Sequence, residues 1–403
     1  MRLIGWELRK ILKRGATKVT MAIAFLWILV NMVLMGFSNY GFGVGVTAPS
    51  WQANRLIAES YQWAEPWRGP ATTEKLLAAR EIALETKDAY TTQDVVSAEN
   101  GSGAWSLLES FAHILIYTDY ADGFTFCSDI DRIPEEAFSQ VYSLREELVQ
   151  QNLSLYQEPQ RSYLQNLESQ VKTPFVYDWY QGHWHVLDFL DDTMFLVGVL
   201  ICIALVPVFT VEVRTGSYRV THCTKNGHWE MSSAKVTAAL LFAGLAFLAA
   251  MGVIFGIQLF YFGTRGLDCS LQLVMYQSVL PLTLGQMEAA LIVFGLISCL
   301  AAASVTIWLS SLFDSSFPVG ILVLLFLVIL RAVAMRMGSE GILGLFAQAV
   351  PFQSQISEFG TVRAISIGGK MMWRPLVRVL INLGEVALLC PLAAWRYATR
   401  RVV

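Results

Sequence analysis

Six long apolar segments constrain this chain more than any other feature of its sequence. They cover residues 19–36, 194–211, 236–262, 282–309, 317–335 and 377–395. A helix needs about 20 mostly apolar residues to cross a bilayer, and these segments are about that long or longer. Since lipid cannot satisfy backbone polar groups, each segment is expected to be helical. Hydrophobic residues make up 55% of the chain. We therefore predict an all-α polytopic membrane protein with six transmembrane helices.

The charged residues are sorted around these apolar segments. Residues 37–192 carry 9 Lys and Arg against 23 Asp and Glu, whereas the rest of the chain carries 20 against 9. Basic residues are retained on the cytoplasmic side of a membrane. Six spans place three basic stretches, 2–18, 214–235 and 396–401, on one side. This predicts a multi-pass protein of the cell (plasma) membrane with its N and C termini in the cytoplasm.

The stretch before the first span has the pattern of an amphipathic helix. Ile4, Leu8 and Ile11 recur at helical spacing within residues 2–15, and Arg and Lys occupy the other face. Such a helix lies in the membrane interface, with its cations towards anionic head groups. A plain cluster of positive charges that orients the first span is the alternative. Residues 1–36 are thus expected to hold this interfacial helix and transmembrane helix 1.

Residues 37–192 are too long for a simple loop and are predicted to form an extracytoplasmic domain. Apolar residues recur at helical spacing in 73–87 and 134–155, which indicates a mainly helical fold. Aromatic residues crowd 175–189, where they suit a head-group belt or, alternatively, a vestibule for an amphipathic substrate. Residues 193–403 are then expected to supply transmembrane helices 2–6.

The sequence lacks the motifs of several enzyme classes. No GxxxxGK[ST], HExxH or GxSxG pattern occurs, so we expect no catalytic site and no cofactor site in this chain. Imidazole and carboxylate groups cluster before the second span, where they suit a divalent metal or merely a solvated acidic segment: His183, His185, Asp188, Asp191 and Asp192. A disulfide between Cys127 and Cys269 is left open.

Three ionisable residues interrupt the apolar segments. They are Glu288 in the fourth, Arg331 in the fifth and Glu385 in the sixth. Charges inside a bilayer are costly and usually face the bundle interior, where they pair with one another. We therefore predict an intramembrane charge cluster in which Arg331 pairs with one or both carboxylates. Such a cluster could serve either as a structural ion pair or as part of a path for substrate or protons.

The segment after the second span has a distinctive pattern. Glu212 is followed four residues later by Gly216, then by Arg219 and by Lys225 in a turn of small polar residues. Here the chain resembles the permease subunits of bacterial type-2 ABC (ATP-binding cassette) transporters. The same family has six spans and cytoplasmic termini. It also begins with an amphipathic elbow helix in the membrane interface, like the one expected over residues 2–15. The resemblance does not cover 37–192, and it is greatest to members with a large domain after the first span.

The resemblance implies a transport subunit that is not itself an enzyme. Residues 212–235 would be the coupling segment that docks on a separate cytoplasmic ATPase, which would bind the ATP and Mg²⁺. The permease would pair with an identical or similar permease, contact membrane lipids but no nucleic acid, and export a substrate that the sequence does not identify. The alternative is a membrane-anchored sensor or assembly protein whose acidic outer domain binds a ligand or partner.

Overall fold

The computed structural model describes residues 2–37, 53–91, 101–116, 126–224, 227–336 and 356–400. Nearly all the regular structure within these ranges is helical, as predicted. Two small antiparallel sheets accompany the helices. One pairs β1 (Gly69–Pro70) with β2 (Val176–Tyr177), and the other pairs β3 (Ala364–Ile367) with β4 (Lys370–Trp373).

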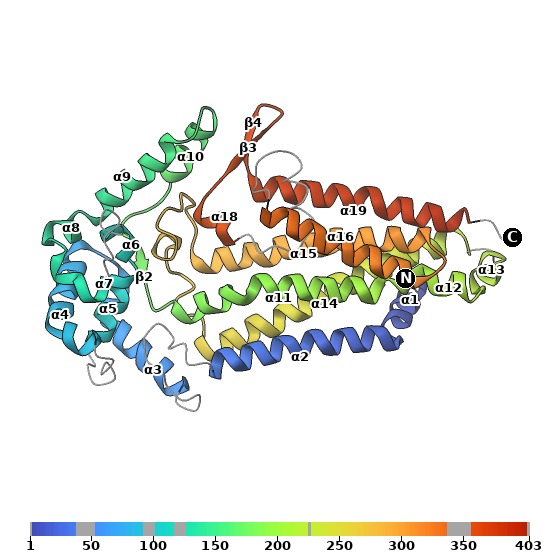
Figure 1. The fold of residues 1–403 in the computed structure, drawn as a ribbon, viewed down its shortest axis with the longest axis horizontal. Helices are drawn as coiled ribbons and strands as arrows, with labels where there is room; N and C mark the ends of the chain where they lie inside the picture. Colours follow the sequence, from blue (N-terminus) through green and yellow to red (C-terminus); the bar gives the residue numbers. More distant parts are fainter. Residues whose placement is uncertain are drawn as a thin grey trace.

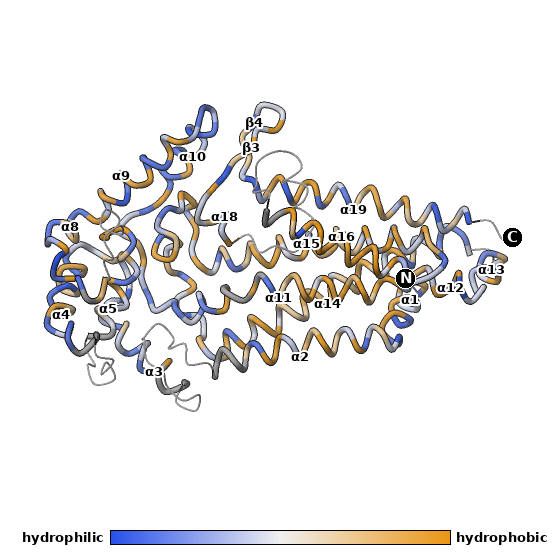
Figure 2. The backbone as a smooth tube through the Cα atoms, viewed as in Figure 1, coloured by the Kyte–Doolittle hydropathy of each residue, from blue (hydrophilic) through white to orange (hydrophobic). Residues whose placement is uncertain are grey.

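Six helical stretches in the described residues are long and apolar enough to cross a membrane. They are α2 (Gly15–Phe37), α11 (Gln181–Leu205) with α12 (Pro207–Arg214), α14 (Trp229–Phe262), α15 (Leu284–Leu312), α16 (Ser316–Arg336) and α19 (Arg374–Ala398). They form one elongated bundle, in which hydrophobic residues predominate (Figures 1 and 2). The predicted all-α architecture with six apolar helices long enough to span a membrane is confirmed, and it suggests a multi-pass membrane protein.

The two ends of this bundle differ in what they carry. At one end lie both ends of the chain, with α1 (Arg2–Lys13) and α13 (Ser217–His222) (Figure 1). We call this the terminus end. The opposite end carries the helices that lie between α2 and α11, and we call it the domain end. The amphipathic stretch predicted before the first span is the separate helix α1, which ends before α2 begins.

The segment between the first and second apolar helices is built of short helices. These are α3 (Ala53–Ala64), α4 (Thr73–Thr91), α5 (Gly101–Glu109), α6 (Ala112–Leu115), α7 (Phe126–Asp129), α8 (Glu135–Ser139), α9 (Val141–Ser154) and α10 (Gln160–Glu168), with 3-10 turns at Glu65–Trp67 and Ile130–Arg132. The helix expected over 73–87 is α4. The helix expected over 134–155 is interrupted at Gln140, which separates α8 from α9.

The aromatic run before the second span corrects an expectation. Phe175, Tyr177, Trp179 and Tyr180 are 0 to 7% exposed, so these rings lie inside the protein and form neither a head-group belt nor an open vestibule. The hydroxyl of Tyr177 donates to the Ser106 hydroxyl at 2.9 Å, so the polar end of that ring is satisfied. These rings therefore serve as core between the short helices and the bundle.

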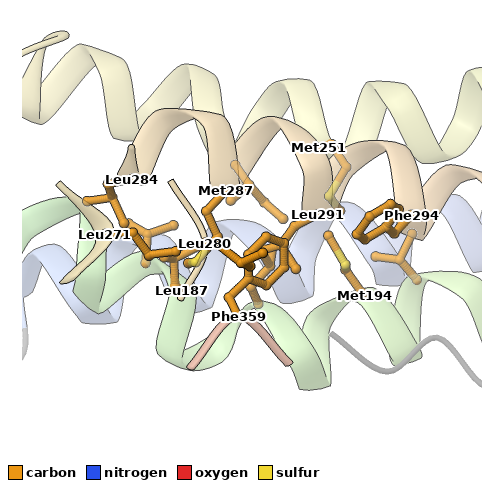
Figure 3. Packing of buried hydrophobic residues seen from close by; sticks show 14 of the residues in the cluster. Leu187, Met194, Met251, Leu271, Leu280, Leu284, Met287, Leu291, Phe294 and Phe359 are labelled. Atoms are coloured by element: carbon orange, nitrogen blue, oxygen red, sulfur yellow. The ribbon is translucent and has the colours of Figure 1, made fainter. Parts of the chain in front are cut away.

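The connection between α14 and α15 ties the short helices to the bundle. Arg145 of α9 donates to the backbone oxygens of Tyr276 and Ser278, at 2.9 and 2.8 Å, and pairs with Glu168 at 2.6 Å. The same connection contributes Leu271 and Leu280 to an apolar core that joins α11, α14, α15 and α18 (Ile356–Gly360) (Figure 3). The domain end is therefore one packed unit rather than a loosely tethered module.

Candidate functional site

A buried charge network holds the terminus end together. Glu7 and Lys10 come from α1, Glu212 from α12, Lys235 from α14 and Tyr397 from α19. The Lys235 ammonium lies 2.6 Å from Glu7 Oε2 and 2.5 Å from Glu212 Oε1. The Lys10 ammonium lies 2.7 Å from Glu7 Oε1 and 3.1 Å from Glu212 Oε1. The Tyr397 hydroxyl donates to Glu212 Oε2 at 2.7 Å. We call these five side chains the terminus-end network.

The network is balanced in charge and nearly closed to solvent. Two carboxylates face two ammonium groups, and Lys235, Glu7 and Glu212 are 1, 3 and 8% exposed. Burying ions is costly unless good geometry and further hydrogen bonds compensate for lost hydration. Here all four carboxylate oxygens accept a bond. Burial by itself lowers the pKa of Lys10, but Glu7 and Glu212 outweigh it and raise that pKa above its ordinary value.

Gly216 separates this network from a short helix. Its φ is +71°, a left-handed conformation that glycine adopts without steric cost. No atom lies within 4 Å of the position that a Cβ would take, so only the backbone conformation favours glycine here. The reversal ends α12 and starts α13, whose first amide bonds include Arg219 N to Gly216 O. Helix α13 is thereby folded back beside the end of the bundle.

One face of α13 is anchored and the other is open. Tyr218 and His222 are buried, and the His222 ring lies 5.3 Å from the ring of Tyr397, which also belongs to the network. On the opposite side, Arg219 is exposed and Val220 is 74% exposed. An exposed valine on a helix beside a basic residue offers an apolar and positively charged contact surface. We call Arg219 and Val220 with the exposed part of α13 the α13 ledge.

The structure separates the residues that the sequence grouped as a coupling segment. The side chain of Glu212 lies inside the protein, where Lys235, Lys10 and Tyr397 satisfy its carboxylate. Gly216 forms the break and Arg219 is on the ledge, whereas Lys225 lies outside the described residues. Sequence reasoning missed Lys235 as a partner, although a lysine at the start of an apolar segment was a usable signal.

A second polar group of residues lies at the domain end. His183 Nε2 is 2.8 Å from the Arg265 carbonyl oxygen, and Gln258 Nε2 is 2.5 Å from His183 Nδ1 and 2.7 Å from Glu288 Oε1. These contacts assign the imidazole proton to Nε2 and leave Nδ1 as an acceptor. Burial lowers the pKa of His183 to about 4, which agrees with a neutral ring. The network links α11, α14 and α15.

The predicted cluster of Glu288, Arg331 and Glu385 is not what the structure shows. Arg331 pairs with Asp192 at 2.5 Å, and its guanidinium lies over the Phe195 ring. The prediction was wrong because Asp192, which lies within α11 just before the apolar segment 194–211, reaches the same depth as Arg331. Glu288 bonds to Gln258, as described above. Glu385 makes no ion pair in the described part of the chain, and its buried Oε2 has no hydrogen-bond partner.

The other candidate groups of the sequence are dispersed. Among the described residues, no three His, Cys, Asp or Glu side chains are placed to hold a metal ion. His183 is committed to Gln258 and Arg265, and the side chains of Asp188 and Asp191 lie outside the description. Cys127 and Cys269 are separate thiols, and Cys269 is buried with its sulfur donating to the Asp178 carbonyl oxygen at 3.2 Å.

Comparisons with known proteins do not assign the chain to a family. No protein-family model matches the chain, and no curated protein or solved structure was found to be similar to it.

Proposed function

We propose that this chain is the membrane-spanning permease subunit of an ATP-driven transporter, and that its terminus end faces the cytoplasm. The observation that carries the proposal is the α13 ledge. It projects from an end where basic residues are frequent, and it stands beside a buried network that joins four helices. A partner that pushes on α13 would act through Tyr218, His222 and Tyr397 on the bundle. The sequence resemblance to type-2 ABC permeases supports the same reading.

In this proposal the network has a mechanical role rather than a docking role. Glu212 and Lys235 keep α1, α12 and α14 in fixed register, because separating either ion from its partners would leave an uncompensated buried charge. A separate ATPase, which binds the ATP and Mg²⁺, docks on Arg219 and Val220. Movement of α13 is then transmitted to α12 and α19 together. The chain performs no chemistry, and a second permease subunit completes the transporter.

Co-expression with an ATP-binding cassette ATPase encoded beside this chain tests the proposal. Val220→Asp should remove the apolar contact and add a charge, so the purified complex should lose most of its ATPase subunit. Val176→Asp makes the same change at an exposed valine of the domain end and should retain it. Equal retention of the ATPase in both variants would contradict docking on the α13 ledge.

A membrane-anchored sensor or assembly protein is the second candidate function. The large acidic segment between α2 and α11 favours it, since sensing requires a domain but no moving bundle. Failure of any ATP-binding cassette ATPase to co-purify with the unaltered chain would favour this candidate over transport.

A further inference from the structure

One face of α19 carries polar side chains at four successive turns. Arg374, Arg378, Asn382 and Glu385 are spaced by four, four and three residues, which places them on one side of the helix. Arg374 Nε and Arg378 Nη2 each donate to the carboxylate of Glu358, both at 3.1 Å. The domain end of this polar face is therefore engaged with a carboxylate of the protein itself.

The two inner side chains of this face are in a different situation. Asn382 is 2% exposed, and its Oδ1 has no hydrogen-bond partner. Glu385 is half-buried, and its shielded Oε2 also has none. A buried oxygen without a donor has lost its hydration and gained nothing in return. Two such acceptors one turn apart point to a hydrogen-bond donor that the described part of the chain does not supply.

The depth of Glu385 makes its isolation more significant. Helix α19 has 25 residues and is long enough to cross a bilayer, and Glu385 is the twelfth of them. In a spanning helix its carboxyl group is therefore close to mid-depth. Ionisable groups at that depth are rare and commonly mark the path of a substrate or ion.

The other carboxylates of the bundle provide the contrast. Glu212 accepts from two ammonium groups and a hydroxyl, and Glu288 accepts from Gln258. Both of these carboxylates thus have donors within the bundle, whereas the buried Oε2 of Glu385 has none in the described part of the chain. Residues 37–192 add an independent observation, since they hold 9 basic against 23 acidic residues and would attract cations from a distance.

We propose that Asn382 and Glu385 form the intramembrane binding point for the positively charged group of an amphipathic substrate. An ammonium group, or the amino substituents of an aromatic cation, would donate to Asn382 Oδ1 and Glu385 Oε2, while the apolar body of the substrate lies among the helices. The acidic segment at the domain end would concentrate the same class of molecule. The inference rests on the proposed transport function and names its substrate class as lipophilic cations.

Dye binding to the purified chain in lipid nanodiscs tests this site without any ATPase. Ethidium is a permanent cation whose fluorescence rises on binding, and it should bind the unaltered chain saturably. Glu385→Gln keeps the size of the side chain but removes its charge, so the dissociation constant should rise by about tenfold or more. Asn382→Leu should weaken binding in the same direction, and Glu385→Asp should largely preserve it.

Glu288→Gln is the matched control, because it makes the same change at a carboxyl group that already has a donor within the bundle. It should leave ethidium binding unchanged. The anionic dye 1-anilinonaphthalene-8-sulfonate should bind the Glu385→Gln variant at least as well as the unaltered chain. The site would be overturned if the Glu385→Gln variant bound ethidium as tightly as the unaltered chain does. It would also be overturned if the variant lost affinity for ethidium and for the anionic dye to the same extent.

Two further measurements distinguish a binding role of Glu385 from a structural one, and distinguish failure of the cation site from failure of the transport proposal. Glu385→Gln removes a charge that has no partner, so membrane yield should be unchanged or higher; a lower yield, or an altered oligomeric state, would assign Glu385 to folding or to contact with a second copy. Ethidium binding that depends on Glu385 in a chain that pairs with no ATPase would overturn the transport proposal and leave the cation site standing.

Discussion

Lys235 and Glu385 are both ionisable residues in apolar helices, yet their surroundings are opposite. Lys235 is 1% exposed and contacts two carboxylates, so its charge is compensated on both sides. Glu385 has no ion partner in the described part of the chain. A compensated charge fixes geometry, because moving it breaks several bonds at once. An uncompensated charge is retained at a cost in stability, which is the usual signature of a functional group.

The terminus-end network leads to a prediction at the residue scale. Glu212→Ala leaves Lys235 with one carboxylate and should lower the free energy of unfolding by about 3–5 kcal/mol. Combining Glu212→Leu with Lys235→Met should be less harmful, because Glu7 and Lys10 still neutralise each other. Thermal unfolding in detergent measures both. Glu230→Ala, an exposed change on the same helix as Lys235, should have little effect, and a double variant no more stable than the single one would contradict the network.

The stability of the folded chain should depend on pH through His183, and it should fall as the pH is lowered. Its pKa is about 4 in the folded chain because of burial, below the ordinary 6.5. The unfolded chain therefore binds a proton more readily, and stability should be full above about pH 6.5 and fall as the pH is lowered towards 4. Nearby groups that modulate this are Asp178, which interacts with the ring, and Glu288, 3.8 Å from Nδ1. Unfolding temperatures at pH 7.5 and 4.5 should differ less in His183→Asn than in the unaltered chain.

At the scale of elements, α13 depends on one backbone conformation. The break between α12 and α13 requires φ near +71°, and any residue with a Cβ is disfavoured there. The sequence places Gly at this position, so the break between the two helices is encoded locally. The aromatic run at 175–180 is the opposite case. Its rings are equally compatible with a membrane surface and a protein interior, and only packing against α5, α9 and α14 decides.

Replacing Gly216 should destabilise the chain to a degree that depends on the new side chain. Gly216→Ala should cost about 1–2 kcal/mol, since the left-handed conformation crowds a Cβ against the backbone. Gly216→Asn should cost less, because Asn adopts this conformation more readily. The measurement is thermal unfolding together with maleimide labelling of Cys223, the exposed thiol that follows α13. If Ala and Asn behaved alike, the left-handed backbone would not be what holds α13 in place.

At the scale of the whole molecule, the orientation in the membrane is the main prediction. The terminus end should face the cytoplasm, because the three basic stretches of the sequence are retained there. In a Cys127→Ser background, an impermeant maleimide applied to intact spheroplasts should label Glu146→Cys of α9 but not Cys223. Cys223 should react after the membrane is permeabilised. Labelling of Cys223 in intact spheroplasts would reverse the proposed orientation and remove the basis for ATPase docking.

The sequence by itself determined the number and kind of the long helices. Twenty or so apolar residues in a row have few alternatives to a membrane-spanning helix, whatever surrounds them, because an unpaired backbone is too costly in lipid. The same holds for α4, whose apolar spacing sets its buried face, and for the break at Gly216. These features depend on interactions within a few residues, so a local pattern suffices to predict them.

Only the tertiary structure decided which charges meet. Arg331 had three carboxylates at compatible depths, and the choice of Asp192 depends on how α16 lies against α11. Glu212 turns inward because α1, α14 and α19 converge on it, and none of those contacts is visible in the spacing of residues 212–235. Partners far apart in sequence are selected by helix packing, which sums many weak contacts across the bundle. The isolation of Glu385, on which the cation site rests, is likewise a property of the packed bundle and of no sequence pattern.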